Sequence, residues 1–235
     1  MKKSSSELKS IAKEILIGHY GLPMGAYVLL CLVSGVITMV LTAVFPLTDS
    51  VSSILYTICT IIVSLLTAII STGLSYLLLN MSRHRDVSLK DLFFGFYHQP
   101  DRIILLTLLI GLIATACVFP GIIFLIFGDF AGLFMVRLLG ILLLIGGIIL
   151  AFYFSLSYSQ VFYLYLDHPE KGVWELMRES QELMRGNKGR YFYLLISFFG
   201  LLLLSVFTCY IGLLWLAPYM EMTQLLFYRN LIGEL

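Results

Sequence analysis

The 235-residue sequence contains few charged residues. Asp, Glu, Lys and Arg make up 12% of it, whereas hydrophobic residues make up 60%. Soluble domains carry roughly 25% charged residues. This composition, with a mean hydropathy of +0.96, excludes an ordinary soluble domain and predicts an integral membrane protein. The formal net charge is only +1, so the chain has no basic footprint for nucleic acid, and we expect no nucleic-acid partner.

Motifs for catalysis and metal binding are also lacking. The sequence has no GxSxG, no HExxH, no glycine-rich phosphate loop and no pair of intramembrane aspartates. The four cysteines form no CxxC or Cys/His pair and lie in apolar runs, which predicts buried free thiols. The four histidines stand in polar segments, as cap and loop residues do. These residues are Cys31, Cys59, Cys117 and Cys209, and His19, His84, His98 and His168. We therefore expect no enzyme, no catalytic residue, no cofactor and no metal site.

Long uncharged runs are what the sequence has in abundance. A helix that crosses a bilayer needs about 20 apolar residues, and Pro and Gly divide these runs. Pro120, for example, is expected to bend or end the third span. The sequence therefore predicts an all-α, polytopic transmembrane helix bundle in a single membrane domain, residues 1–235. Its six spans are expected at residues 24–45, 54–79, 103–127, 133–166, 191–207 and 211–231.

The C-terminal end allows either five or six spans. Residues 191–220 are uncharged and would measure about 45 Å as one helix, against a hydrocarbon core of about 30 Å, so we expect a hairpin. With six spans, every Lys and Arg except Arg137 lies on the cytoplasmic side, whereas five spans also place Arg229 outside. The positive-inside rule therefore favours six spans, with both termini in the cytoplasm and the chain in the cell membrane.

Three polar segments have the periodicity of amphipathic helices. They lie at residues 1–21, 88–97 and 170–186, and the last has its apolar face at i, i+3, i+4 and i+7 from Val173. Ser4 with Glu7, and Ser88 with Asp91, suit capping boxes. We expect interfacial helices on the cytoplasmic side. Each precedes a pair of spans, which indicates either a threefold repeat or the usual start of a membrane hairpin.

Residues spread over much of the chain form a pattern that resembles that of a known protein family. The positions are Pro120, Gly121, Tyr158, Pro169, Glu179, Ser180, Leu183, Met184, Gly186, Lys188, Phe192, Ser197, Phe198, Gly200, Gly212, Pro218, Tyr219, Thr223, Phe227 and Tyr228. With the opening LKSIAKEILIGHYG, they make the chain similar to domain-of-unknown-function family 975, integral membrane proteins found mostly in Gram-positive bacteria. Gly189 and Glu221 depart from the family pattern, which has an aromatic residue and a neutral amide there. The resemblance implies the architecture and no activity, so any role of Glu221 would belong to this member.

Polar residues within the expected spans form a candidate intramembrane site. By helical rise, Glu221 lies about 13 Å from Gly212, near the expected midplane. An unpaired carboxylate there is expected to be protonated, because desolvation disfavours its charge. It is either a protonatable or cation-binding group in a transport path, or a hydrogen-bond donor to a neighbouring helix. Arg137 either reaches the headgroups or pairs with Glu221. The candidate site comprises Glu221, Arg137, Gln160, Tyr219, Thr223 and Gln224.

The segment at 170–186 and the residues after it form a second candidate surface. Its cations suit anionic lipid headgroups, at about 1 kcal/mol each near the surface, and the same features suit a protein partner. A helix that only connects two spans is the third interpretation. The candidate contacts are Trp174, Arg178, Glu179, Arg185, Lys188 and Arg190. The expected partners are thus the lipid bilayer, anionic lipid headgroups, and a protein partner or second copy of the chain.

Two functions from different classes follow from these features. The first is a small transporter, or a protein that handles lipids or amphiphiles, with a polar path near Glu221. The second is a non-transporting scaffold, assembly or immunity-type factor that acts through its cytoplasmic amphipathic helices. The carboxyl close to a helix break at Pro218 favours the first.

Overall fold

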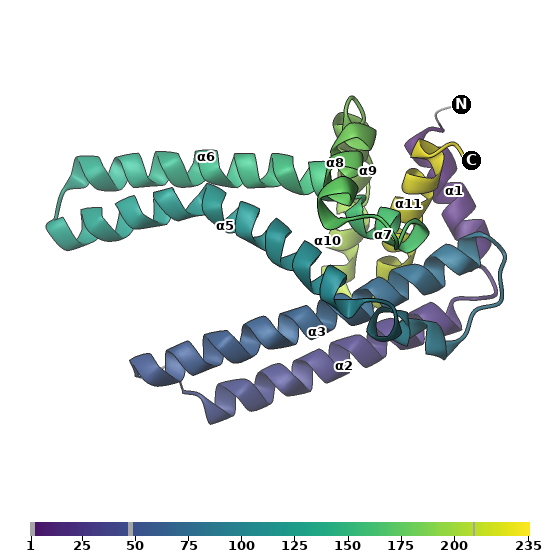
Figure 1. Ribbon diagram of the computed structural model, residues 1–235, viewed down its shortest axis with the longest axis horizontal. Coiled ribbons are helices and arrows are strands. Elements are labelled where there is room, and N and C mark those ends of the chain that lie inside the picture. Colours follow the sequence, from purple (N-terminus) through teal and green to yellow (C-terminus); the bar gives the residue numbers. More distant parts are fainter. Residues whose placement is uncertain (1–2, 47–48, 209) are drawn as a thin grey trace. The chain divides into compact units, whose positions relative to one another are not determined.

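The computed structural model describes residues 3–46, 49–208 and 210–235, and these residues are helical with no strand among them (Figure 1). The α-helices are α1 (Ser5–Leu16), α2 (Gly21–Val44), α3 (Ser50–Ser82), α4 (Phe94–Tyr97), α5 (Pro100–Ala131), α6 (Phe134–Tyr158), α7 (Val161–Asp167), α8 (Val173–Met184), α9 (Lys188–Ile196), α10 (Phe199–Phe207) and α11 (Leu213–Leu231), with a 3-10 helix, η1 (Leu89–Phe93), before α4. The prediction of an all-helical fold is confirmed.

Five helical stretches are long and apolar enough to cross a membrane. They are Gly21–Val44, Ser50–Ser82, Pro100–Ala131, Phe134–Asp167 and Lys188–Phe207. The chain therefore has the character of a multi-pass membrane protein. The sixth expected span, residues 211–231, is helical as α11 but is not among the five. Polar residues such as Glu221, Gln224 and Arg229 make it less apolar, and the count of six stays a prediction.

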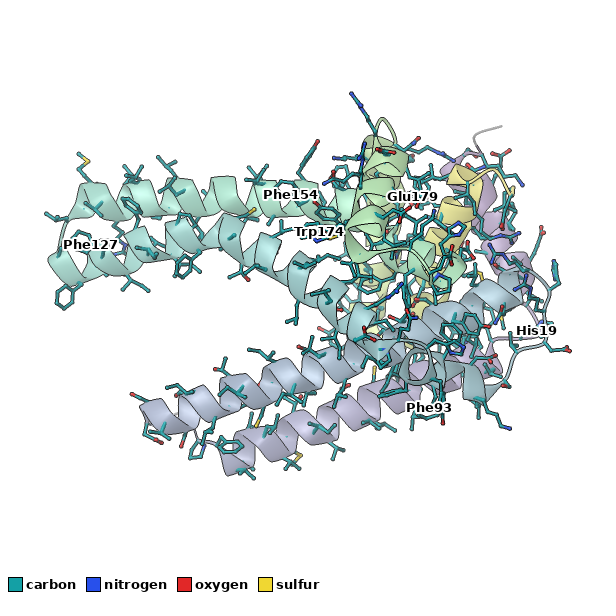
Figure 2. All side chains as sticks on the ribbon, viewed as in Figure 1. His19, Phe93, Phe127, Phe154, Trp174 and Glu179 are labelled. Carbon is teal, nitrogen blue, oxygen red and sulfur yellow. The ribbon has the colours of Figure 1, made fainter. Side chains whose placement is uncertain are left out.

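Many apolar side chains on these long helices are exposed. Met39 on α2 is 76% exposed and Val51 on α3 is 66% exposed. Phe127 on α5, labelled in Figure 2, is 57% exposed. Continuous apolar surface of this kind is expected to be covered by lipid.

Two of the expected spans are interrupted, and one is longer than expected. The span at 133–166 consists of α6 and α7, and the span at 191–207 consists of α9 and α10. In contrast, α5 continues through Pro120 to Ala131, so the helix does not end at that proline. Proline removes one backbone hydrogen bond from a helix and clashes with the preceding turn, but α5 is helical on both sides of Pro120.

The cysteines are only partly as predicted. Cys31, Cys59 and Cys117 are free thiols, but Cys31 is exposed and the other two are half-buried. The prediction of burial was wrong for Cys31, because its apolar run forms an outer helix face rather than a protein core. Cys209, like residues 1 and 2 of the first expected interfacial helix, lies outside the described residues.

The chain forms two compact units. The first contains Met1–Ile104 with Arg190–Leu235, and the second contains Leu105–Gly189. The first unit therefore joins the beginning of the chain to its end. Figure 1 shows α1 beside α11 in this unit, and the two helices are in direct contact.

The amphipathic helix α1 buries its apolar face on protein. It begins with the predicted capping box, in which the Ser4 hydroxyl accepts the Glu7 N–H and the Glu7 carboxylate accepts the Ser4 N–H. Leu8, Ala12 and Leu16 are fully buried, and α1 packs against α11. The apolar stripe therefore has a protein partner, and an interfacial position of α1 stays a prediction.

The expected helix at 88–97 is formed by η1 and α4, which lie against α3. It starts with the predicted capping box of Ser88 and Asp91. A Cβ added to Gly73 of α3 would lie 2.0 Å from the Leu92 carbonyl oxygen, so the backbones meet there. The Tyr76 and Phe94 rings stack with their centroids 3.9 Å apart.

The helix α8 in the second unit confirms the predicted apolar face at 170–186. Val173, Leu176, Met177 and Met184 are buried. Its partners are α6 and α7, and the buried Ser180 hydroxyl donates to the Ser157 carbonyl at 2.8 Å. This face, like that of α1, is thus covered by protein.

In the second unit, α5 and α6 approach each other at glycines, which gives a matched pair of variants. A Cβ on Gly147 would lie 2.2 Å from the Cys117 carbonyl oxygen, whereas a Cβ on Gly146 would meet nothing within 4 Å. We expect Gly147→Ala to lower the free energy of unfolding by about 1–3 kcal/mol. Gly146→Ala should leave it unchanged or raised, because alanine favours helix. Thermal unfolding in detergent measures both, and equal effects would contradict the close approach.

Candidate functional site

Glu221 on α11 is held by hydroxyl groups from two other helices. Ser75 of α3 donates its hydroxyl to Oε1 at 2.6 Å, and Tyr27 of α2 donates to Oε2. The residue is half-buried, and in the described part of the chain no cation pairs with its carboxyl. A hydroxyl can donate to a carboxylate or accept from a protonated carboxyl. The arrangement therefore accommodates both protonation states of Glu221.

The hydrogen bonds to α3 show where Glu221 lies along that helix, and the expected midplane depth stays a prediction. The Glu221 carboxyl is level with Ser75, which lies about 6 Å by helical rise from the end of the expected span 54–79. Farther along the same two helices, Arg229 of α11 donates to the Ser82 carbonyl of α3 at 2.6 Å. The two helices therefore run side by side in the same direction, and Glu221 lies nearer to the Arg83 end of α3.

The other candidate residues on α11 tie this helix to different partners. The Tyr219 hydroxyl donates to the Lys9 carbonyl of α1 at 3.3 Å, and Gln224 Oε1 accepts from the Tyr191 hydroxyl of α9 at 2.7 Å. Thr223 is fully buried and bonds the Tyr219 carbonyl of its own helix at 2.7 Å. These contacts hold α11 against α1 and α9, whereas Glu221 contacts α2 and α3.

Arg137 and Gln160 belong to the second unit. Arg137 Nε lies 3.4 Å from Asp129 Oδ1, and both side chains are exposed, so the partner of this arginine is at the α5–α6 turn. Gln160 is fully buried, and its amide nitrogen donates to the Ser159 hydroxyl at 2.8 Å. Its amide oxygen has no partner among the described residues.

Three of the predicted contact residues, Trp174, Arg178 and Glu179, lie on α8. Trp174 is 73% exposed and is labelled with Glu179 in Figure 2. Arg178 Nε pairs with Glu182 at 3.1 Å, and both are well exposed. Lys171 Nζ lies 2.6 Å from Glu179, and this hydrogen bond raises the pKa of Lys171. Glu179 is thus engaged with a neighbouring loop, and Trp174 and Arg178 face outward.

The remaining contact candidates divide between the two units. Arg185 and Lys188 line a cavity of about 580 Å³ in the second unit, where Lys188 Nζ lies 3.5 Å from the centroid of the Tyr153 ring. Arg190 belongs to the first unit and is half-buried. Its guanidinium donates to Asn230 Oδ1 at 2.6 Å and to the Lys3 carbonyl. It therefore joins the two ends of the chain.

The sequence analysis missed both partners of Glu221. Tyr27 and Ser75 are polar residues within apolar runs, which makes them candidates for contacts between helices. Many other hydroxyl residues in those runs have the same property, so the sequence does not single these two out. Most of the others bond a carbonyl of their own helix, as Thr38 does with Ser34 at 2.8 Å.

A cluster at the ends of α3 and α11 was also missed. Glu234 lies between two arginines, with its Oε1 2.7 Å from Arg83 Nη2 and its Oε2 2.8 Å from Arg229 Nε. Burial works against the charged form of Glu234, but the hydrogen bonds and charges of both arginines outweigh it. They hold the pKa of this carboxyl below its ordinary value of 4.5.

The stability that this cluster contributes is expected to depend on pH. Because the folded pKa of Glu234 is lowered, the contribution is present above the ordinary value and is lost as pH falls through the folded pKa. At neutral pH, Glu234→Gln should therefore melt at a lower temperature than the wild type, and the two melting temperatures should approach each other as the pH falls below the ordinary value of 4.5 and through the folded pKa. Glu182→Gln, which breaks an exposed pair, is the control. A gap that is the same at all pH values would contradict this account.

Together, the five apolar stretches and the buried polar contacts between helices define an α-helical, multi-pass membrane protein. The chain belongs to the family described as "Protein of unknown function (DUF975)", which it matches over residues 1–234. No curated protein and no solved structure matches it.

Proposed function

We propose that the chain is a small, non-enzymatic transporter, or a protein that handles lipids or amphiphiles, in which Glu221 binds and releases a proton or cation. The observation that carries the proposal is the carboxyl between the hydroxyls of Tyr27 and Ser75, with no cation paired to it in the described part of the chain. Ionisable groups among membrane helices are costly and are functional by default. The protein is proposed to lie in the cell membrane with both termini in the cytoplasm.

Helix interruptions close to this site support the proposal. The stretch Lys188–Phe207 is broken between α9 and α10, and Lys9 Nζ of α1 donates to the freed Ser197 carbonyl at 2.9 Å. Lys9 Nζ also lies 4.0 Å from the centroid of the Phe198 ring. Pro218 stands inside α11, close to Glu221. Interrupted helices with partners for their free backbone groups are typical of transporter sites.

A small apolar cavity in the first unit favours an amphiphilic ligand. It has a volume of about 290 Å³, which is near the lower limit for ligand pockets. Its lining residues are mostly apolar with a few hydroxyls: Tyr20, Leu201, Leu204, Ser205, Thr208, Gly212, Trp215, Leu216 and Tyr219. Such a lining suits a hydrocarbon chain with a polar end.

Infrared spectroscopy of the purified protein tests the proton-binding role directly. We expect a protonated-carboxyl band that disappears as the pH is raised between about pH 4 and pH 9 and that is missing from Glu221→Gln. We also expect this band to shift in D2O, because water must reach a carboxyl that exchanges protons. A spectrum of the wild type identical to that of Glu221→Gln across this range would overturn the proposal.

The exposed Trp174 favours a second candidate function, a non-transporting scaffold, assembly or immunity-type factor. This aromatic residue lies outside the face that α8 buries on α6 and α7. An exposed aromatic beside Arg178 suits a membrane surface or a protein partner. Under this alternative, Trp174→Ala and Arg178→Ala abolish cellular activity and Glu221→Gln does not. The proposed transport function predicts the reverse.

A further inference from the structure

A pocket of about 630 Å³ opens at the ends of α1, α3 and α11 in the first unit. Its lining combines cationic and apolar groups: Ile11, Glu14, Ile15, Ser82, Arg83, His84, Arg85, Arg229, Glu234 and Leu235. Three arginines face two glutamates there, and one of those glutamates is the residue held between Arg83 and Arg229. Without Glu234, three arginines and one glutamate side chain would line the pocket.

The two arginines hold Glu234 as they would hold a bound anion. Arg83 uses two nitrogens, with Nη2 2.7 Å from Oε1 and Nε 3.3 Å from Oε2. Arg229 adds Nε at 2.8 Å from Oε2 and is itself fixed by its bond to the Ser82 carbonyl. This two-nitrogen geometry is the one in which guanidinium groups bind carboxylate and phosphate alike.

We propose that this pocket binds the phosphate group of an anionic ligand, and that the Glu234 carboxylate occupies the phosphate position when the ligand is absent. The pocket volume far exceeds what one carboxylate fills, so there is room for the rest of a ligand. Ile11 and Ile15 line the pocket from α1 and provide apolar contacts for it. The phosphate group can belong to a lipid headgroup or to a soluble ester, and both satisfy the arginines in the same way.

Glu234 is more exposed than the two arginines that bind it, so a ligand can displace its carboxylate. Its side chain is 35% exposed, whereas those of Arg83 and Arg229 are 16% and 12% exposed. It follows Gly233, whose φ of +83° turns the chain back after α11, and its N–H bonds the Arg229 carbonyl at 2.9 Å. A ligand therefore has to displace one half-exposed carboxylate, and removing that charge should strengthen binding.

The location of this pocket also suits a lipid as the source of the phosphate group. Arg83 directly follows α3, which is one of the five stretches apolar enough to cross a membrane. Headgroups are expected at this level, and arginines there attract anionic lipids. A lipid would place its phosphate between the arginines and its apolar part along Ile11 and Ile15.

Calorimetric titration of the full chain in a neutral detergent tests the proposal with three probes. These are short-chain phosphatidylglycerol, glycerol 3-phosphate and inorganic phosphate. We expect Glu234→Gln to tighten binding by about tenfold and Arg83→Gln to weaken it by about tenfold, as for hydrogen bonds to charged groups. Arg83→Lys keeps the charge and loses the two-nitrogen geometry, so it should fall between wild type and Arg83→Gln. Lys90→Gln, which removes an exposed cation of η1 outside this pocket, is the control and should bind like the wild type.

The probes separate the two sources of phosphate. Phosphatidylglycerol binding more tightly than both soluble probes indicates a lipid site, and the opposite order indicates a soluble ester. Failure of Glu234→Gln to bind any probe, or equal binding by Arg83→Gln and wild type, would overturn the proposal. The pocket lining contains none of Glu221, Tyr27 and Ser75, so the effects of Glu234→Gln and Arg83→Gln are independent of the transport proposal.

Discussion

Glu221→Leu is expected to destabilise the protein strongly, whereas Glu221→Gln is expected to unfold close to the wild type. Leucine removes the acceptor that the hydroxyls of Tyr27 and the buried Ser75 share, and loss of a buried hydrogen bond in this way costs about 1–3 kcal/mol. Glutamine keeps the length and one acceptor oxygen, and its amide can donate to a hydroxyl. The free energy of unfolding should therefore fall by roughly 2 kcal/mol or more for leucine alone.

The same pair of variants separates a structural from a functional carboxyl. Both are compared by thermal unfolding in detergent and by activity in cells. If Glu221 only links helices, Glu221→Gln keeps both stability and activity. The proposed role predicts that it keeps stability and loses activity. Tyr27→Phe, which removes one hydroxyl, should cost less stability than Glu221→Leu; an equal or larger cost would contradict the shared acceptor.

Gly73→Ala is expected to have a comparably large effect, through packing. An added Cβ would lie 2.0 Å from the carbonyl oxygen and 2.5 Å from the carbonyl carbon of Leu92. Both atoms are backbone, so η1 must move away from α3, and overpacking of this kind costs about 1–3 kcal/mol or more. The measurement is the midpoint of thermal unfolding of the purified variant. Since Gly73 is close to Ser75 along α3, the displacement should also weaken the hold on Glu221.

The control for Gly73→Ala lies in the same unit. Gly25 of α2 has nothing within 4 Å of an added Cβ, so Gly25→Ala should leave the midpoint unchanged or raise it. A wild-type midpoint for Gly73→Ala would show that η1 does not lie against α3.

The sequence was sufficient to predict the helices but not what covers them. Long uncharged runs have one stable form in lipid, and the periodicity from Val173 gave the buried face of α8 correctly. The same kind of pattern in α1 was interpreted as an interfacial helix. Its apolar stripe, centred on Ala12, is buried, and α1 packs against α11. The sequence pattern does not indicate this contact, because α11 is distant from α1 along the chain, and the interfacial position stays a prediction.

The sequence likewise predicted only part of the candidate site. Glu221 stands out because a carboxylate in an apolar run is costly wherever it lies. Its depth stays a prediction, which rests on counting from Gly212; in the structure Glu221 lies toward the Arg83 end of α3. The charged residues of the cluster at Glu234 come from segments that are distant in the sequence. Each residue taken alone is an ordinary charge near a helix end, so the sequence does not indicate the cluster.

The central claim is that water and protons reach Glu221, and thiol labelling in membranes tests it most directly. Single cysteines replace Glu221, the fully buried Leu226 of the same helix and the exposed Lys13 of α1, in a variant without the native cysteines. A membrane-impermeant thiol reagent should label positions 13 and 221 and leave position 226 unlabelled. Labelling at position 13 alone, with position 221 reacting only after denaturation, would contradict the account.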